Sequence, residues 1–208
     1  MTEFWNDSVT DASWKKLQEL RKEVDFVLIG GWAVYIYTKL HKSKDIDIIV
    51  DYGALRKLES MYRMNKNERL REYEVVLDRF DIDVYLPSYS KLALPVEDIA
   101  REAVQKNGFA VPTPEMLFAL KLGAYSDRGK SIKGDKDSID LLGLLFYGGV
   151  DTAKLGALLK RYGLESYARV LLGVLVGFDR NMLKFLNLDE KSFSVMRKKY
   201  EPQIRKIL

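Results

Sequence analysis

Apolar and polar residues alternate in two short segments in the first half of the chain, and this pattern predicts two β-strands. Residues 45–50 read Asp-Ile-Asp-Ile-Ile-Val, and residues 80–86 read Phe-Asp-Ile-Asp-Val-Tyr-Leu. Side chains along a strand point alternately to opposite faces, so Asp45 and Asp47 must share one face while the isoleucines face the core. Each segment therefore presents a pair of carboxylates on one side of a predicted sheet.

These paired carboxylates suggest a metal site. Like charges on one face repel each other, and a divalent cation with a preference for oxygen ligands, such as Mg²⁺ or Mn²⁺, relieves that repulsion. Asp81 and Asp83 share a face by the same alternation, so either can supply a third carboxylate from a neighbouring strand. Three such groups can hold two cations, an arrangement that activates a hydroxyl and stabilises a leaving pyrophosphate. The chemistry indicated is phosphoryl or nucleotidyl transfer.

Other periodic segments predict a mixed first half and a helical second half. Residues 10–13 offer N-cap residues for a helix that continues to residue 24, and residues 25–29 read as a strand. Further segments are a buried helix at 32–37, an amphipathic helix over 55–62 and a strand over 73–77. Beyond Pro114 the spacing is helical, with glycine-containing connections expected at Gly129, Gly134, Gly148-Gly149 and Gly163.

The predicted fold class is α+β (mixed α/β), with a mixed sheet flanked by helices and followed by a C-terminal helical bundle. We place the boundary near Pro112, giving a catalytic core over 1–112 and a helical region over 113–208. The helical region is expected to contribute basic residues to the same site.

The amino-acid composition limits the metal ligands and the binding partners that the chain can have. The chain has 208 residues, no cysteine and one histidine, which excludes disulfides and leaves carboxylates as the plausible metal ligands. The net charge of +4 permits contact with nucleic acid without requiring it. No apolar stretch is long enough to span a bilayer and no secretion signal is visible at the N-terminus, so we expect a cytoplasmic protein without membrane contact.

The order of motifs resembles that of a known superfamily. Ile29-Gly30-Gly31, a spacer and Asp45-Ile46-Asp47 are similar to the pattern of the DNA polymerase beta-like nucleotidyltransferases, which is an apolar residue, Gly, Gly or Ser, a spacer and Asp-x-Asp. Residues 41–47 are similar to the Arg-x-Thr-Lys-Asp-x-Asp segment of minimal and AbiEii-type members, although His41 replaces the arginine and reads as a loop residue. Residues 121–141 resemble the same group's Lys, Arg and Lys-Asp-x-x-Asp-Leu signature. The match covers residues 24–145.

The resemblance implies a role for each matching residue. The catalytic and metal-binding residues would be Asp45, Asp47 and Asp83, with Asp81 as the rival of Asp83. Backbone amides at Gly30 and Gly31 would approach the triphosphate. The other nucleotide-binding residues would be Ser43, Lys44, Lys121 and Arg128. Lys136, Asp137 and Asp140 would either orient the last two of these or contact the nucleotide or acceptor.

The predicted function is transfer of a nucleoside monophosphate from a nucleoside triphosphate to a hydroxyl acceptor, with release of pyrophosphate. An RNA end, a protein side chain and a small molecule all stay open as acceptors. The resemblance also suggests a toxin–antitoxin component with a small helical partner protein. The alternatives are a catalytically silent module that binds nucleotide, RNA or a partner, and a phosphohydrolase. A basic amphipathic helix is expected over residues 191–208, with its apolar side packed and its basic side available to RNA or a partner.

Overall fold

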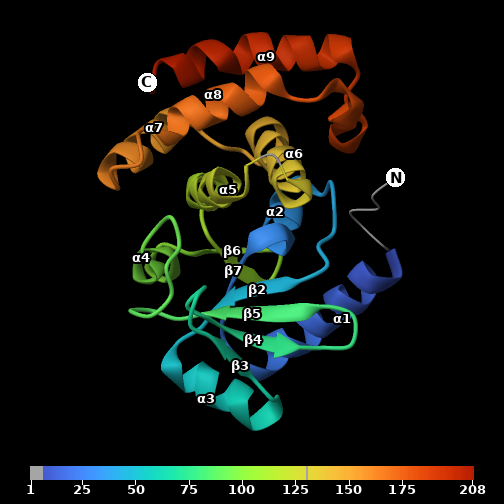
Figure 1. Ribbon diagram of the computed structural model, residues 1–208, viewed down its shortest axis with the longest axis vertical. Helices are drawn as coiled ribbons and strands as arrows, with labels where there is room; N and C mark the ends of the chain where they lie inside the picture. Colours follow the sequence, from blue (N-terminus) through green and yellow to red (C-terminus); the bar gives the residue numbers. More distant parts are fainter. Residues whose placement is uncertain (1–6, 130) are drawn as a thin grey trace. The chain divides into compact units, whose positions relative to one another are not determined.

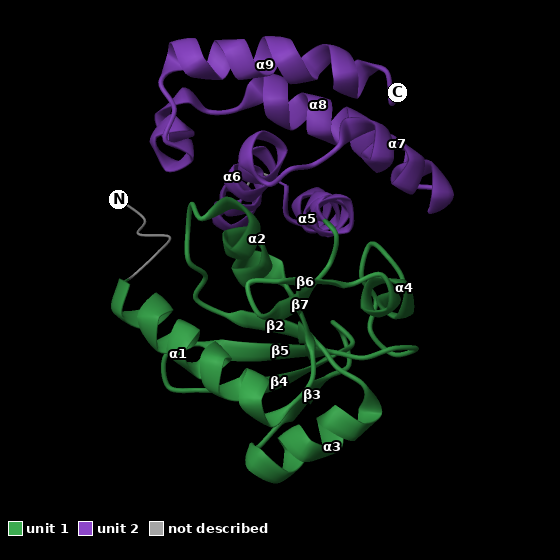
Figure 2. Cartoon of the chain, turned by 180° about the vertical axis from the view of Figure 1, so that it is seen from behind, with its two compact units in different colours: residues 1–113 green, residues 114–208 purple. Residues whose placement is uncertain are grey.

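The two alternating segments form neighbouring strands of one mixed sheet. The computed structural model describes residues 7–129 and 131–208, and the chain divides into two compact units, residues 1–113 and 114–208 (Figure 2). The elements of the first unit are α1 (Asp7–Glu23), β1 (Val27–Ile29), α2 (Gly30–Thr38), β2 (Ile46–Ile49), α3 (Tyr52–Met61), β3 (Asn65–Asn67), β4 (Glu72–Val76), β5 (Asp81–Tyr85), α4 (Val96–Arg101), β6 (Val104–Lys106) and β7 (Phe109–Val111).

The described strands form a seven-stranded sheet in the order β3-β4-β5-β2-β1-β7-β6 (Figure 1). The pairs β2–β5 and β1–β7 are parallel and the other neighbours are antiparallel. One face carries an apolar row in which Leu28, Ile48 and Val84 lie side by side on three strands. All three side chains are fully buried. This row fixes the register, because a slip of one residue would turn each apolar side chain to the opposite face.

Helix α1 crosses one face of the sheet (Figures 1 and 2). Its start differs from the position that the sequence predicts. The helix begins at Asp7, so the predicted N-cap at residues 10–13 is wrong. Thr10 and Ser13 are buried within the helix. The Ser13 hydroxyl accepts a 2.9 Å hydrogen bond from the indole N–H of fully buried Trp32. Ser13, a residue type that favours caps, here satisfies a buried donor instead.

The second unit is helical, as predicted. Its elements are α5 (Pro114–Arg128), α6 (Ile132–Tyr147), α7 (Thr152–Arg161), α8 (Tyr167–Gly177), the 3₁₀ segment η1 (Arg180–Leu186) and α9 (Glu190–Arg205). Side-chain oxygens of Ser131, Asp151 and Asp189 accept hydrogen bonds from the first backbone amides of α6, α7 and α9. The expected connection at Gly134 is wrong, because Gly134 lies inside α6. A Cβ there would lie 1.8 Å from the Gly129 carbonyl oxygen, so close backbone approach explains the glycine.

The predicted fold class is confirmed: a mixed sheet flanked by helices is followed by C-terminal helices. Helix α9 packs its apolar side as expected, with Phe193, Tyr200 and Ile204 buried. The sequence analysis did not predict β3, α4, β6 or β7. No helix in the described part of the chain is long and apolar enough to cross a membrane.

Candidate functional site

The acidic face of the sheet brings two of the predicted carboxylates into direct register. Asp47 on β2 lies opposite Asp83 on the parallel neighbour β5. On the other side of β5, Glu74 of β4 lies opposite Asp83. All three side chains are partly buried. A row of three carboxyl groups thus crosses three adjacent strands, on the face opposite the apolar row.

The electrostatics of this row are unfavourable for a charged Asp83. Burial, and after it the negative charges of Asp47, Glu72, Asp45 and Glu74 in that order, together raise the pKa of Asp83 to about 8. Without a compensating cation, Asp83 therefore carries a proton at neutral pH. A group that binds here and bears positive charge would favour the ionised form.

Asp45 and Asp81 share the acidic face but are arranged differently. The Asp81 backbone N–H donates a 3.2 Å hydrogen bond to Asp45 Oδ1, and Lys44 Nζ lies 3.7 Å from the same oxygen. Asp81 itself lies opposite Val76 of β4. Of the two candidates for the third carboxylate, Asp83 is therefore the one that lies beside Asp47. Asp45 is on the same face, two residues before Asp47 along the chain.

Gly30 packs directly against Asp47. Helix α2 begins at Gly30, whose φ of +63° lies in the left-handed region that favours glycine. A Cβ at this position would lie 2.0 Å from Asp47 Oδ2. The preceding residue, Ile29, makes no side-chain cap at the start of α2 among the described contacts. The first amides of α2 thus begin beside a carboxylate, where an anion can approach them only if the local negative charge is balanced.

Two of the remaining predicted phosphate-binding residues of the first unit, Ser43 and Lys44, lie in the loop between α2 and β2. Ser43 is buried and Lys44 is exposed apart from its ion pair with Asp45. His41 is a loop residue, as expected. Gly31 is buried inside α2. Binding of nucleotide by Ser43, Lys44 and Gly31 stays a prediction.

Sequence analysis missed two acids of this face, Glu72 and Glu74. Glu72 is 8 % exposed and hydrogen-bonds the hydroxyl of Tyr85, whose pKa is raised by burial and then by Asp47, Glu72 and Asp83. The alternation of Tyr73 and Val75 contained the signal, since it places residues 72 and 74 on the opposite face from them.

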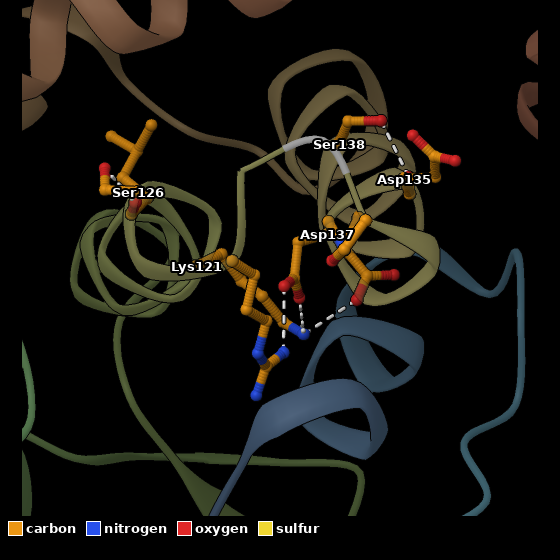
Figure 3. A network of polar contacts seen from close by, with 10 residues as sticks. Lys121, Ser126, Asp135, Asp137 and Ser138 are labelled. Atoms are coloured by element: carbon orange, nitrogen blue, oxygen red, sulfur yellow. Dashed lines mark hydrogen bonds and ion pairs between the residues drawn. The ribbon is translucent and has the colours of Figure 1, made fainter.

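Lys121 of the second unit points toward the buried carboxylate of Asp137 (Figure 3), and Arg128 contacts the same carboxylate. Lys121 Nζ donates to Asp137 Oδ1 at 3.3 Å, and Arg128 Nη1 donates to Asp137 Oδ2 at 2.8 Å. The side chain of Asp137 is 2 % exposed and that of Lys121 is 10 % exposed, whereas that of Arg128 is 45 % exposed. The predicted projection of both cations from one face of α5 is consistent with this shared partner.

Asp140 completes the group. Its Oδ2 atom lies 2.8 Å from Lys121 Nζ as an ion pair, but the angles are not those of a hydrogen bond, and among the described residues this buried atom accepts none. Lys121 thus contacts both buried acids, and Arg128 contacts Asp137. The expectation that Asp137 and Asp140 orient the two cations agrees with this geometry.

A metal ion was expected on the acidic face. Within residues 7–129 and 131–208, no three or more His, Asp or Glu side chains are arranged so that they could hold a metal ion by themselves. The chemistry of the donors nevertheless fits Mg²⁺, which is commonly bound by one or two carboxylates together with substrate phosphates. The aligned pair of Asp47 and Asp83 and the raised pKa of Asp83 are the observations that support this fit.

Comparison with known proteins adds a likeness of fold. No protein-family model and no curated protein matches the chain. Among solved structures, JHP933 from Helicobacter pylori matches with a TM-score of 0.51 and 16 % identity, over 97 % of this chain and 95 % of that one. The chain shares its fold with JHP933. At this identity the likeness does not extend to activity.

Two further solved structures are more distant. An antigenic nucleotidyltransferase-like protein from Paracoccidioides brasiliensis gives a TM-score of 0.43 at 15 % identity, covering 88 % of this chain and 91 % of that one. The STING-associated CdnE c-di-GMP synthase from Capnocytophaga granulosa gives 0.31 at 12 % identity, covering 97 % and 81 %. Both TM-scores are below 0.5, so neither match bears on the function of this chain.

Replacing Gly30 with alanine should destabilise the first unit. The new Cβ meets the Asp47 carboxylate and requires a left-handed backbone, so we expect the free energy of unfolding to fall by about 2–5 kcal/mol. Urea unfolding measures the loss. Gly173→Ala is the control, because its added Cβ has no atom within 4 Å in helix α8, and it should gain up to about 1 kcal/mol. An unchanged stability of Gly30→Ala would contradict the packing described.

The raised pKa of Asp83 makes stability depend on pH. The folded pKa of about 8 exceeds the unfolded value of about 3.9, so the folded state binds the proton more tightly. The free energy of unfolding should therefore fall as pH rises from about 4 to about 8. In EDTA at pH 8, Asp83→Asn should be more stable than wild type by about 1–2 kcal/mol, and near pH 4 the two should be equal.

Urea unfolding across this pH range tests the expectation for Asp83. Asp78→Asn is the control, because its side chain is 96 % exposed and the change should stay within about 0.5 kcal/mol at every pH. If Asp83→Asn is no more stable than wild type at pH 8, ionisation of Asp83 does not destabilise the folded protein and the prediction is wrong.

Substitution of the buried acid Asp137 should destabilise the second unit more than substitution of the exposed base Arg128. Asp137→Asn removes one of the buried acids that contact Lys121 and should lower the free energy of unfolding by about 3–5 kcal/mol. Arg128→Gln removes an exposed partner of the same acid and should cost less, about 1 kcal/mol. Denaturant unfolding compares them, and equal losses would refute the assignment of Lys121 and Asp137 as the structural pair.

Proposed function

We propose that this chain is a metal-dependent nucleotidyltransferase that moves a nucleoside monophosphate from a nucleoside triphosphate to a hydroxyl acceptor and releases pyrophosphate. The observation that carries the proposal is the register of Asp47 with Asp83 directly beside Gly30. A carboxylate pair and the first amides of a helix are thereby placed together. One group suits a cation and the other suits phosphate, which is the combination that a bound metal–triphosphate needs.

The residues of the first unit have separate tasks in this proposal. Asp45, Asp47 and Asp83 would hold Mg²⁺ or Mn²⁺, with two ions expected. When bound, the cations neutralise charge on the phosphates and lower the pKa of an attacking hydroxyl. Amides at Gly30 and Gly31 donate to phosphate oxygens. The Lys44 ammonium group, which is paired with Asp45, would bind a phosphate oxygen of the nucleotide.

The reaction balances without a further reagent. The acceptor oxygen forms a bond to the α-phosphorus, and the bond from that phosphorus to the oxygen bridging to the β-phosphorus breaks. Pyrophosphate leaves with the electron pair of the broken bond. Asp83, ionised once a cation beside it balances the local negative charge, would take the proton of the acceptor hydroxyl.

Triphosphate binding by Lys121 and Arg128 is a separate part of the proposal. The two residues differ in what they can offer, since Lys121 is buried between two acids and Arg128 is nearly half exposed. Arg128 is therefore the better candidate for a phosphate ligand. The acceptor class, an AbiEii-type role in a toxin–antitoxin pair and a small helical partner protein are predictions that follow from the sequence resemblance alone.

The proposal predicts that transfer depends on Asp47 and Asp83 and much less on Asp81. Wild type and the Asn variants are incubated with Mg²⁺, each α-³²P-labelled nucleoside triphosphate, bulk RNA and cell lysate. Loss of Asp47 or Asp83 should lower transfer by more than about 100-fold, since even outer partners of metal ligands cost 10- to 100-fold. Asp81→Asn is the matched control and should change the rate by less than tenfold, because it lies opposite Val76 and not beside Asp47.

The same experiment separates the alternatives. Metal-dependent nucleotide binding without label transfer or pyrophosphate release would favour a silent binding module. Release of phosphate in place of pyrophosphate would identify a phosphohydrolase. Equal loss of transfer in Asp81→Asn and Asp83→Asn would refute the choice of the third carboxylate.

A further inference from the structure

Positive charge is concentrated in the last quarter of the chain. Residues 152–208 contain twelve Lys and Arg against five Asp and Glu, a net charge of +7. The whole chain has a net charge of +4, so residues 1–151 carry a net charge of −3. Helices α7 to α9 are therefore the basic part of the protein.

Several acids in this segment are already engaged locally. Asp179 and Asp189 accept hydrogen bonds from the first amides of η1 and α9. Glu201 accepts from Arg197 at 3.0 Å and from Arg205 at 2.7 Å. These carboxylates therefore do little to neutralise the other exposed lysines and arginines of the segment.

Helix α9 arranges its basic residues as a stripe on its exposed side. Lys191, Lys198 and Arg205, which we call the basic stripe, are spaced seven residues apart and are all exposed, and Arg205 is the member that also pairs with Glu201. Seven residues make two turns, so the three charges lie on one line about 10.5 Å apart along the axis. Lys199 and Lys206 form a second line with the same spacing. Such a row suits a partner with repeated negative charge.

The apolar side of α9 is not available to a partner. Phe193, Tyr200 and Ile204 are buried, and α9 packs along α8 (Figure 1). A basic amphipathic helix binds a membrane by inserting its apolar side, so this arrangement disfavours a lipid surface. The exposed side offers point charges with one apolar residue, Val195, between them.

A groove lies next to the second line of lysines. It has a volume of about 510 Å³ and lies between α7 and the end of α9. Its charged lining residues are Lys160, Lys206 and Glu165, a net charge of +1, and three small residues, Ala153, Gly156 and Ala157, also line it. Small side chains on α7 leave room for a ligand, and the volume falls in the range of sites that take one small ligand. A groove of this size has room for a single nucleotide, so we expect a single strand to bind in preference to a duplex.

We infer that the surface formed by the basic stripe and the groove between α7 and α9 binds the phosphodiester backbone of a single nucleic-acid strand. Lysines at regular spacing contact phosphates without reading sequence. The groove can accept one nucleotide of the strand between Lys160 and Lys206. This binding does not depend on nucleotidyl transfer, so it can hold or fail independently of the proposed function.

The test is fluorescence anisotropy with a 5′-fluorescein-labelled 20-nucleotide RNA of mixed sequence, with DNA of the same sequence and with the corresponding duplex. Nucleoside triphosphates are left out, so that catalysis plays no part. Wild type should bind the single strands at 50 mM NaCl and weaken steeply by 200 mM NaCl. The RNA and DNA arms show which backbone is preferred.

The combined variant Lys191→Gln, Lys198→Gln, Arg205→Gln should weaken binding at least tenfold. It should also reduce the slope of log K against log salt by about 2, since each phosphate contact with a single strand contributes about 0.7. Lys160→Gln with Lys206→Gln should weaken binding separately, through the groove. The matched control removes three exposed charges from the first unit, by replacing Lys15, Lys22 and Arg56 with Gln, and should change affinity by less than twofold.

Several results would overturn the inference. They are failure of wild type to bind either strand at 50 mM NaCl, equal weakening by the control variant, and binding of the duplex as tightly as the strand. Tighter binding to vesicles of phosphatidylcholine and phosphatidylserine, or to polyglutamate, would assign the surface to a membrane or an acidic protein. Far-UV circular dichroism of each variant establishes that the substitutions leave the helices intact.

Discussion

The register of β2 with β5 is the constraint on which the rest of the first unit depends. It aligns Ile48 with Val84 on one face, and the same alignment forces Asp47 beside Asp83 on the other. Repulsion between the acids opposes this pairing, and burial of the apolar row supports it. Moving the strands by one residue would expose the apolar row, so the fold keeps the acids together at the cost of a pKa of about 8 for Asp83.

Helix α2 is shaped by the same constraint. Gly30 must take a positive φ and must lack a side chain, because Asp47 occupies the space where a Cβ would lie. A serine or aspartate cap, which would ordinarily satisfy the first amides of a helix, is likewise missing at Ile29 among the described contacts. The start of α2 therefore gives up local stabilisation beside a pair of like charges, which is typical of a site whose ligand supplies the missing interactions.

Sequence predicted the parts of this arrangement that depend on alternation and failed where tertiary contacts decide. Strict periodicity was enough to place Asp47 and Asp83 on one face, because the period of a strand is fixed by its backbone. It could not show that Asp45 accepts the Asp81 amide, since that contact depends on the register between strands. Ser13 was read as a cap because its side chain suits one, but its partner is the indole of Trp32, nineteen residues away. Gly134 was read as a connection because glycine favours turns, whereas the Gly129 carbonyl excludes a side chain there.

Burial separates two uses of the same basic residue types in the second unit. Lys121 is enclosed by Asp137 and Asp140, and losing either acid would remove part of the negative charge that compensates this buried lysine. The basic stripe of α9 lies in water, where each charge is screened and contributes little to stability. The sequence contains both sets as ordinary lysines and arginines on helices, and only their surroundings show that one set holds the unit together while the other is available to a polyanion.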